Sequence, residues 1–76
     1  MTSENFDRVL SELKSIQPFR VFSVELHGGR RFEVDYPDAL VNREGIAVFI
    51  APGGAPIIFD HDSVLRFIAA SANVQA

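Results

Sequence analysis

The feature that most constrains the fold is a run of alternating apolar and polar residues, residues 22–36, interrupted by the pair Gly28-Gly29. On both sides of the glycines every second residue is apolar, which is the period of a half-buried β-strand. The apolar set comprises Phe22, Val24, Leu26, Phe32, Val34 and Tyr36. The run therefore predicts an antiparallel hairpin with one face in the core.

The alternation also limits the register of this hairpin, because residues opposite each other in an antiparallel pair point to the same side of the sheet. A two-residue turn at Gly28-Gly29 would set Leu26 opposite Arg31 and bury charge. A longer turn or a glycine bulge sets Leu26 opposite Phe32 instead, which is the predicted register. The same register pairs Val24 with Val34, Phe22 with Tyr36, Glu25 with Glu33 and Ser23 with Asp35. It predicts an acidic strip on the outer face.

The residues before the hairpin predict one amphipathic helix, at about residues 3–17, that covers the sheet. Its apolar residues lie at helical spacing on one stripe: Phe6, Val9, Leu10, Leu13 and Ile16. Ser3 is a suitable N-cap, and Pro18 blocks continuation of the helix. We expect the stripe to pack in the core, with a membrane or a partner protein as the alternative.

Three later apolar runs predict short strands at residues 46–51, 57–59 and 64–69, separated by turns. The tail, residues 70–76, has small and polar residues without a pattern and is expected to fray. With the strands placed in residues 19–69, the chain is predicted to be a single domain over residues 1–76. It is mainly β with one N-terminal α-helix.

Composition excludes several classes of function. The chain has no cysteine, which excludes disulfides and cysteine-ligated zinc and favours a reducing, cytoplasmic location. Its net charge of −3 acts against binding to nucleic acid or anionic membranes. The longest apolar run is too short to span a bilayer, and the first residues lack the features of a signal peptide. We expect no cofactor and no membrane association.

The segment PFRVFSVELHGGRRFEVDYPDAL, residues 18–40, is similar to a group of uncharacterised small bacterial proteins. These begin with a helix and continue with a Pro-Phe-Arg strand, a glycine turn and a strand that ends in proline, and the resemblance spans residues 6–67. One helix followed by about five short strands also resembles the Sm-like or SH3-like barrel. Residues 26–32 are similar to the L-x-x-G-R-x-F opening of the first Sm motif. The resemblance implies a small five-stranded barrel.

Some Sm-like barrels bind RNA, and the chain departs from them at the positions that read uracil. Val34 stands where Sm proteins usually have glycine, and no Arg-Gly pair precedes the last strand. The resemblance therefore implies the barrel and gives little support to RNA binding. A nucleic-acid site would use the basic cluster at the hairpin tip, His27, Arg30 and Arg31.

For each candidate metal or catalytic site, a structural role explains the same residues better. The run Asp60-His61-Asp62 has side chains that bind metals, but adjacent residues in a turn seldom converge on one ion. We expect an aspartate there to cap a turn. His27 or His61 with a serine and an aspartate lacks the order of a catalytic triad. The sequence therefore predicts no enzyme, no catalytic residue and no metal site.

Two of the predicted strands are apolar on both faces, which predicts self-association. In residues 46–50 we expect Ile46, Val48 and Ile50 to fill the barrel, and Ala47 and Phe49 to point outwards. Exposed apolar strands are normally covered. We expect a homo-oligomer, either a face-to-face dimer or an edge-to-edge ring. Its interface includes Phe49 and part of the run Ile57, Ile58 and Phe59, since at least one large apolar residue of that run must point out.

The predicted function is a non-enzymatic interaction or structural module that assembles with itself or binds a protein partner. The alternative is an Sm-like nucleic-acid-binding protein.

Overall fold

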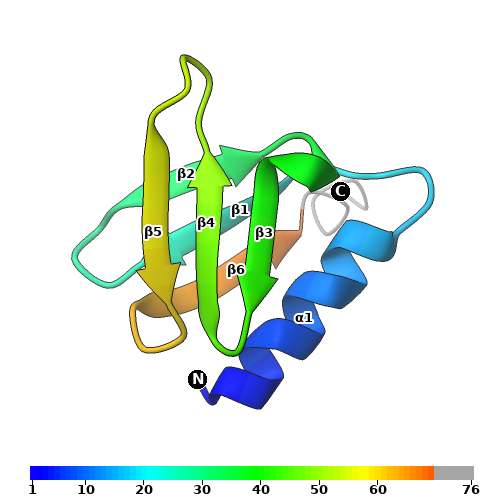
Figure 1. The fold of residues 1–76 in the computed structure, drawn as a ribbon. Helices are drawn as coiled ribbons and strands as arrows, with labels where there is room; N and C mark the ends of the chain where they lie inside the picture. The colour runs from blue at the N-terminus through cyan, green and yellow to red at the C-terminus, as the bar shows by residue number, and fades with distance from the viewer. Residues whose placement is uncertain (70–76) are drawn as a thin grey trace, which may run out of the picture.

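The computed structural model describes residues 1–69 of the 76-residue chain, and the tail that was predicted to fray lies outside them. One helix precedes six strands, which form two three-stranded antiparallel sheets (Figure 1). The elements are α1 Ser3–Ser15, β1 Phe22–Leu26, β2 Arg31–Val34, β3 Leu40–Arg43, β4 Ile46–Ile50, β5 Pro56–Asp60 and β6 Val64–Ala69. The first sheet has the order β2-β1-β6 and the second the order β3-β4-β5.

The predicted five-stranded barrel is wrong. Among residues 1–69 the strands pair only within these two sheets, so no closed barrel forms. The chain crosses between the sheets through the 3₁₀ turn Pro37–Ala39 and again at the corner after β5. After that corner β6 pairs with β1 and not with its neighbour in sequence, β5. The coarser prediction, a mainly β domain with one N-terminal helix, is confirmed.

The strand β3 is absent from the prediction. Its Asn42 lies on the inner side of the sheet, where the side-chain Nδ2 donates to Asp7 Oδ1 of α1 at 2.8 Å. The other oxygen of Asp7 accepts a hydrogen bond from the Gly45 backbone N–H at 2.9 Å. A polar residue at an inward position breaks the apolar alternation, so the strand had no recognisable pattern.

The glycine hairpin forms with the predicted faces but a different register. Val24 lies opposite Phe32, and Phe22 lies opposite Val34, which is a shift of two residues from the prediction. The Leu26 N–H donates to the Arg30 carbonyl at 2.7 Å, so the turn is longer than two residues. A shift of two preserves which face each side chain points to.

The new register changes the charges that face each other. Glu25 lies opposite Arg31 and not opposite Glu33, so the predicted acidic strip is replaced by a pair of opposite charges. Opposite charges at such positions are favourable, whereas like charges are destabilising. Tyr36 lies beyond the end of β2 and is 60% exposed.

Helix α1 forms where it was predicted, with its N-cap one residue earlier. Thr2 accepts a hydrogen bond from the Asn5 N–H on its side-chain hydroxyl at 3.1 Å, and this takes the role expected of Ser3. No helix among residues 1–69 is long and apolar enough to cross a membrane.

The apolar stripe of α1 packs in the core, which confirms that interpretation. Phe6 and Leu10 are fully buried, while Ile16 lies just beyond the helix and is 37% exposed. The Phe6 ring lies 5.9 Å from that of Phe59 and 6.0 Å from that of Phe67, centroid to centroid. Since Phe59 belongs to the second sheet and Phe67 to the first, α1 joins the two sheets along one side (Figure 1).

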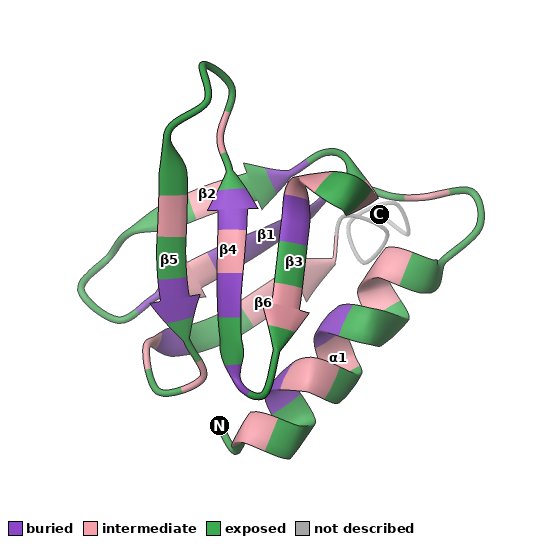
Figure 2. Cartoon of the chain, in the orientation of Figure 1, coloured by how far each residue is buried: buried purple, intermediate pink, exposed green. Residues whose placement is uncertain are grey.

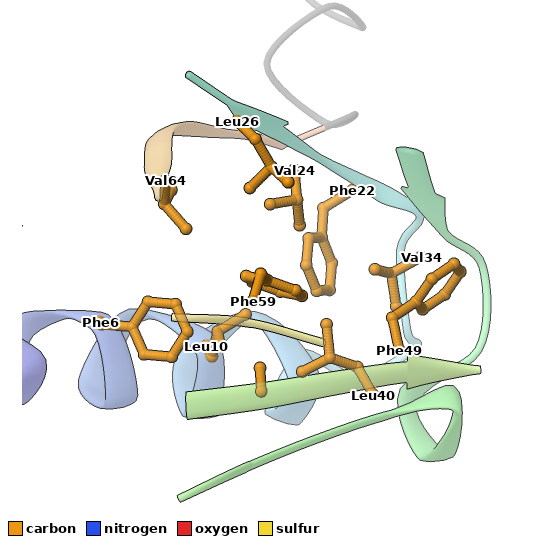
Figure 3. Packing of buried hydrophobic residues seen from close by; sticks show 11 residues of the cluster. Phe6, Leu10, Phe22, Val24, Leu26, Val34, Leu40, Phe49, Phe59 and Val64 are labelled. Carbon is orange, nitrogen blue, oxygen red and sulfur yellow. The ribbon is translucent and has the colours of Figure 1, made fainter. Parts of the chain in front are cut away.

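Both sheets contribute to one hydrophobic core beside α1 (Figure 3). The first sheet supplies Phe22, Val24 and Val34, and the second supplies Leu40 and Phe49. Along β3 and β4 more buried and more exposed residues alternate, as expected for a sheet with one face in the core (Figure 2).

Candidate functional site

The orientation of β4 is opposite to the predicted one. Ala47 and Phe49 are 0% and 2% exposed and face the core, whereas Ile46 and Ile50 are 54% and 47% exposed. The Phe49 ring stacks on Phe32 of the facing sheet, with the centroids 4.8 Å apart and the planes at 19°. Phe49 can make this aromatic contact only when its side chain points inward, and this is the physical reason for the orientation of β4.

The four residues predicted at an oligomer interface therefore divide between the core and the surface. Phe49 and Phe59 are buried, and Ile57 is half-buried against the core. Ile58 is 70% exposed on the opposite face of β5. Of these four, only Ile58 lies on the outer surface of the second sheet.

The outer surface of the second sheet carries aliphatic residues from all three strands, in rows that follow the pairing register. We call this surface the outer face; its members are Val41, Arg43, Ile46, Val48, Ile50, Pro56, Ile58 and Asp60. The middle row runs from Val41 on β3 through Val48 on β4 to Ile58 on β5. Val41 is 64% exposed and Ile58 is 70% exposed, so this row is largely in solvent.

The apolar part of the outer face is large for so small a domain. At these exposures it covers on the order of 400 Å², within the range of about 300–600 Å² found for the largest apolar patches of monomeric proteins. Patches of this size are often functional. In the sequence, this face was indicated by the β-branched residues Ile46, Val48 and Ile50 at alternate positions of β4. The prediction assigned these residues to the core.

One end of the outer face carries opposite charges on its two flanking strands. The end row runs from Arg43 on β3 through Ile46 on β4 to Asp60 on β5. Arg43 contacts Glu44 at 3.9 Å, with both side chains more than four-fifths exposed. Such exposed pairs contribute little, so the guanidinium is free to meet another carboxylate.

The carboxylate of Asp60 is held in place by the corner that follows β5. Its Oδ1 accepts hydrogen bonds from the Ser63 hydroxyl at 2.7 Å and from the Ser63 backbone N–H at 3.0 Å. The hydroxyl hydrogen bond lowers the pKa of Asp60 below its ordinary value. Asp60 is therefore ionised at neutral pH. Its row borders a hollow of about 250 Å³ lined by Ile46, Ile58, Phe59, Asp60 and Ser63.

A cleft of about 520 Å³ is lined by residues of β2, β4 and β5 and of the loops that follow β2 and β4. Phe32 and Phe49 form its apolar wall, together with Ile57, which was predicted at the interface. Arg31, Glu33 and Asp35 bring both signs of charge to its lining. The cleft therefore selects no ligand class by charge.

The basic cluster of the hairpin tip is exposed, as a solvated turn would be. His27, Arg30 and Arg31 all lie on the surface. Arg31 has Glu25 opposite it on β1, so the positive field at this site is partly neutralised.

The candidate catalytic residues come close together without forming a triad. The Ser63 hydroxyl donates to Asp60, and the His27 backbone N–H donates to the Ser63 carbonyl at 2.9 Å. No histidine ring is hydrogen-bonded to Ser63 in the described part of the chain. The ring nitrogen Nδ1 of His61 lies 2.8 Å from the Met1 carbonyl instead. Ser63 therefore lacks the general base that a nucleophile needs.

The run Asp60-His61-Asp62 forms the corner between β5 and β6. Asp60 caps this turn, which confirms the predicted role for an aspartate there. Across residues 1–69, no three potential ligand side chains are placed to share an ion.

Comparison with known proteins identifies no relative: no family model matches the chain, and neither the curated proteins nor the solved structures contain a significant match. The functional interpretation therefore depends on the surfaces described above.

Proposed function

We propose that the protein is a non-enzymatic interaction module that associates with itself through the outer face. The observation that supports this most directly is the middle row on three neighbouring strands, in which half-buried Val48 lies between exposed Val41 and Ile58. Hydrophobic residues scattered singly on a surface need no explanation, whereas a contiguous apolar patch of this size is often functional. Burying it removes apolar area from water, which is the main driving force of protein association.

The charges around the patch also suit a protein interface. Homodimer interfaces have an apolar centre and a polar rim that remains hydrated. On the outer face, Arg43 and Asp60 lie at one end of the aliphatic rows, and Glu44 of the β3–β4 turn lies beside Arg43. Their position at the end leaves the centre free of charges that would have to be desolvated.

The alternative, nucleic-acid binding at His27, Arg30 and Arg31, has no comparable support. The net charge is −3, and the residue opposite Arg31 is acidic. A mobility-shift titration with oligo-U RNA at two salt concentrations tests it, because phosphate contacts would give a strong salt dependence. We expect no shift at micromolar protein.

Self-association is tested by sedimentation equilibrium from micromolar to several hundred micromolar protein. We expect a reversible monomer–dimer equilibrium, and an Ile58→Lys variant that dimerises at least about tenfold more weakly, because a charge in the interface must be desolvated. Leu65→Lys is the matched control, since Leu65 is an exposed apolar residue, 47% exposed, on the first sheet. It should dimerise like the parent.

Two results would contradict the proposal. The first is a parent protein that remains a single monomeric species over the whole concentration range. The second is equal weakening by Ile58→Lys and Leu65→Lys, which would show that the outer face is not the interface. Circular dichroism checks that both variants keep the fold.

A further inference from the structure

We infer that the outer face binds a second copy through a two-fold axis parallel to β4, which sets Arg43 of each copy against Asp60 of the other. This rests on the proposed function and adds the arrangement of the two copies. It follows from the register of the second sheet and from the position of its charges.

The order of the strands determines which contacts each two-fold axis creates. In a symmetric dimer the same patch is used twice, so a contact from residue i to residue j is repeated from j to i. When the axis runs along β4, the two copies of β4 lie over each other, and β3 of each copy lies over β5 of the other. Val48 then meets its own counterpart, and Val41 meets Ile58, which keeps aliphatic side chains on aliphatic side chains.

The same operation pairs the charges of the end row. Arg43 lies on β3 and Asp60 on β5, in register with Ile46 between them. Because β3 of each copy lies over β5 of the other, the Arg43 guanidinium of each copy lies over the Asp60 carboxylate of the other. This contact occurs twice in the dimer. An axis across the strands would stack β3 on β3 in the opposite direction. It would place Arg43 at the start of the partner's β3, where the outer face has no carboxylate and Asp38 belongs to the 3₁₀ turn before the strand. Charge complementarity selects the axis along β4.

The area of the face is sufficient for a specific dimer interface. Homodimer interfaces are about 65% apolar, so an apolar patch on the order of 400 Å² implies about 600 Å² buried per copy and about 1,200 Å² in total. This is the lower end of the range for specific interfaces. Two such sheets would stack about 10 Å apart with their strands nearly aligned, as in a β-sandwich.

The charge pairing is tested by a double-mutant cycle on the dimer dissociation constant, with the variants Arg43→Glu and Asp60→Asn. Asparagine retains the oxygen that accepts the Ser63 hydrogen bonds and removes only the charge. We expect Arg43→Glu alone to weaken the dimer about tenfold, and Asp60→Asn alone about threefold. In the Asp60→Asn background, Arg43→Glu should weaken it by no more than about twofold.

Arg20→Glu is the control for net charge. Arg20 is exposed, lies outside the outer face, and its replacement changes the net charge by the same amount as Arg43→Glu. It should weaken the dimer no more than about twofold in either background, because long-range repulsion is screened at physiological salt.

A cross-linking experiment tests the position of the axis independently. The chain has no cysteine, so a Val48→Cys variant carries a single thiol. With Val48 on the axis, a short bismaleimide should link the two copies efficiently, since stacked sheets lie about 10 Å apart. A Glu33→Cys variant, exposed on the first sheet, should give little dimeric product.

The outcomes separate this inference from the proposed function. Coupling between Arg43 and Asp60, together with cross-linking at residue 48, supports the arrangement. A dimer that Ile58→Lys disrupts, but in which the two charge variants act independently, overturns the axis and leaves the outer face as the interface. A parent protein that is monomeric at every concentration overturns both.

Discussion

The two sheets have similar inner faces and opposite outer faces. Inside, each sheet contributes buried aromatic and aliphatic residues to the same core, with Phe22 at 1% exposure in the first and Phe49 at 2% in the second. Outside, the first sheet carries charges, and Arg66 Nε donates to Glu25 Oε1 at 2.7 Å across the paired strands β6 and β1. The second sheet carries exposed valine and isoleucine at the corresponding positions.

This difference shows which face of the molecule has a structural role and which requires another explanation. A charged outer face is stable in water and needs no partner. An aliphatic outer face contributes nothing to the stability of a lone monomer, because its side chains stay hydrated. The second sheet therefore carries apolar residues that its own fold does not use, and this is the basis of the proposed self-association.

The largest expected effect tests whether the inner faces of the sheets are equivalent. Phe22→Ala and Phe49→Ala should each lower the free energy of unfolding by about 3–5 kcal/mol, the usual cost of deleting a buried aromatic ring. Ile58→Ala on the outer face should cost less than about 1 kcal/mol in the monomer, because its side chain is already exposed. Urea unfolding at low micromolar protein, where the monomer dominates, measures all three. A Phe49→Ala variant as stable as Ile58→Ala would mean that β4 has the opposite orientation.

The turns of the two sheets provide a second comparison, in which the expected loss of unfolding free energy is intermediate. Gly45, between β3 and β4, has φ +84°, and an added Cβ would lie 2.8 Å from both His61 Cδ2 and Ser3 Cβ. Gly29 in the first hairpin has φ +90° with nothing within 4 Å of an added Cβ. Gly45→Ala should therefore cost about 2–4 kcal/mol through strain and overpacking, and Gly29→Ala about 1 kcal/mol through strain alone.

Thermal or urea unfolding of the two glycine variants measures this difference. Equal losses would show that backbone strain dominates at both turns. The close packing of the β3–β4 turn against α1 would then be unimportant for stability.

The smallest expected effect concerns the charged outer face of the first sheet. The Glu25 and Arg66 side chains are 23% and 62% exposed, so their ion pair is partly screened by solvent. A double-mutant cycle with Glu25→Gln and Arg66→Gln should give a coupling of about 0.2–1 kcal/mol that decreases with added salt. Neither variant should change the dimer dissociation constant. A dimer weakened by these changes would place the interface on the first sheet.

The sequence predicted the buried faces of the hairpin and of the helix well, because in both elements burying any other face would bury polar residues. In the hairpin, any other face would bury Glu25, Arg31 or Glu33. In α1, the apolar residues form a single stripe, and Phe6 and Leu10 are buried as expected. The register of the hairpin was wrong by two residues because such a shift keeps every side chain on its face.

The strand β3 and the candidate site were not predictable in the same way. At Asn42 the amide faces inward, where Asp7 of α1 satisfies it, and such a contact exists only after the helix has docked. The interface prediction left open which of the residues 57–59 point out, and it assigned Phe49 to the surface without any polar residue to decide between the two parities. Ile58 lies on the surface, and Phe59 lies inside with Phe49.

By itself, the sequence determined the helix and the inner face of the first hairpin, because the spacing of their polar residues leaves one way to keep charges in water. Apolar runs between turns placed most of the other strands. The tertiary structure decided the rest. It oriented β4 by stacking Phe49 on Phe32, and it sent β6 back to β1, which produced two sheets and not a barrel. The reason is that an all-apolar strand has two faces of nearly equal hydrophobicity, so only the shape of the side chains across the core distinguishes them.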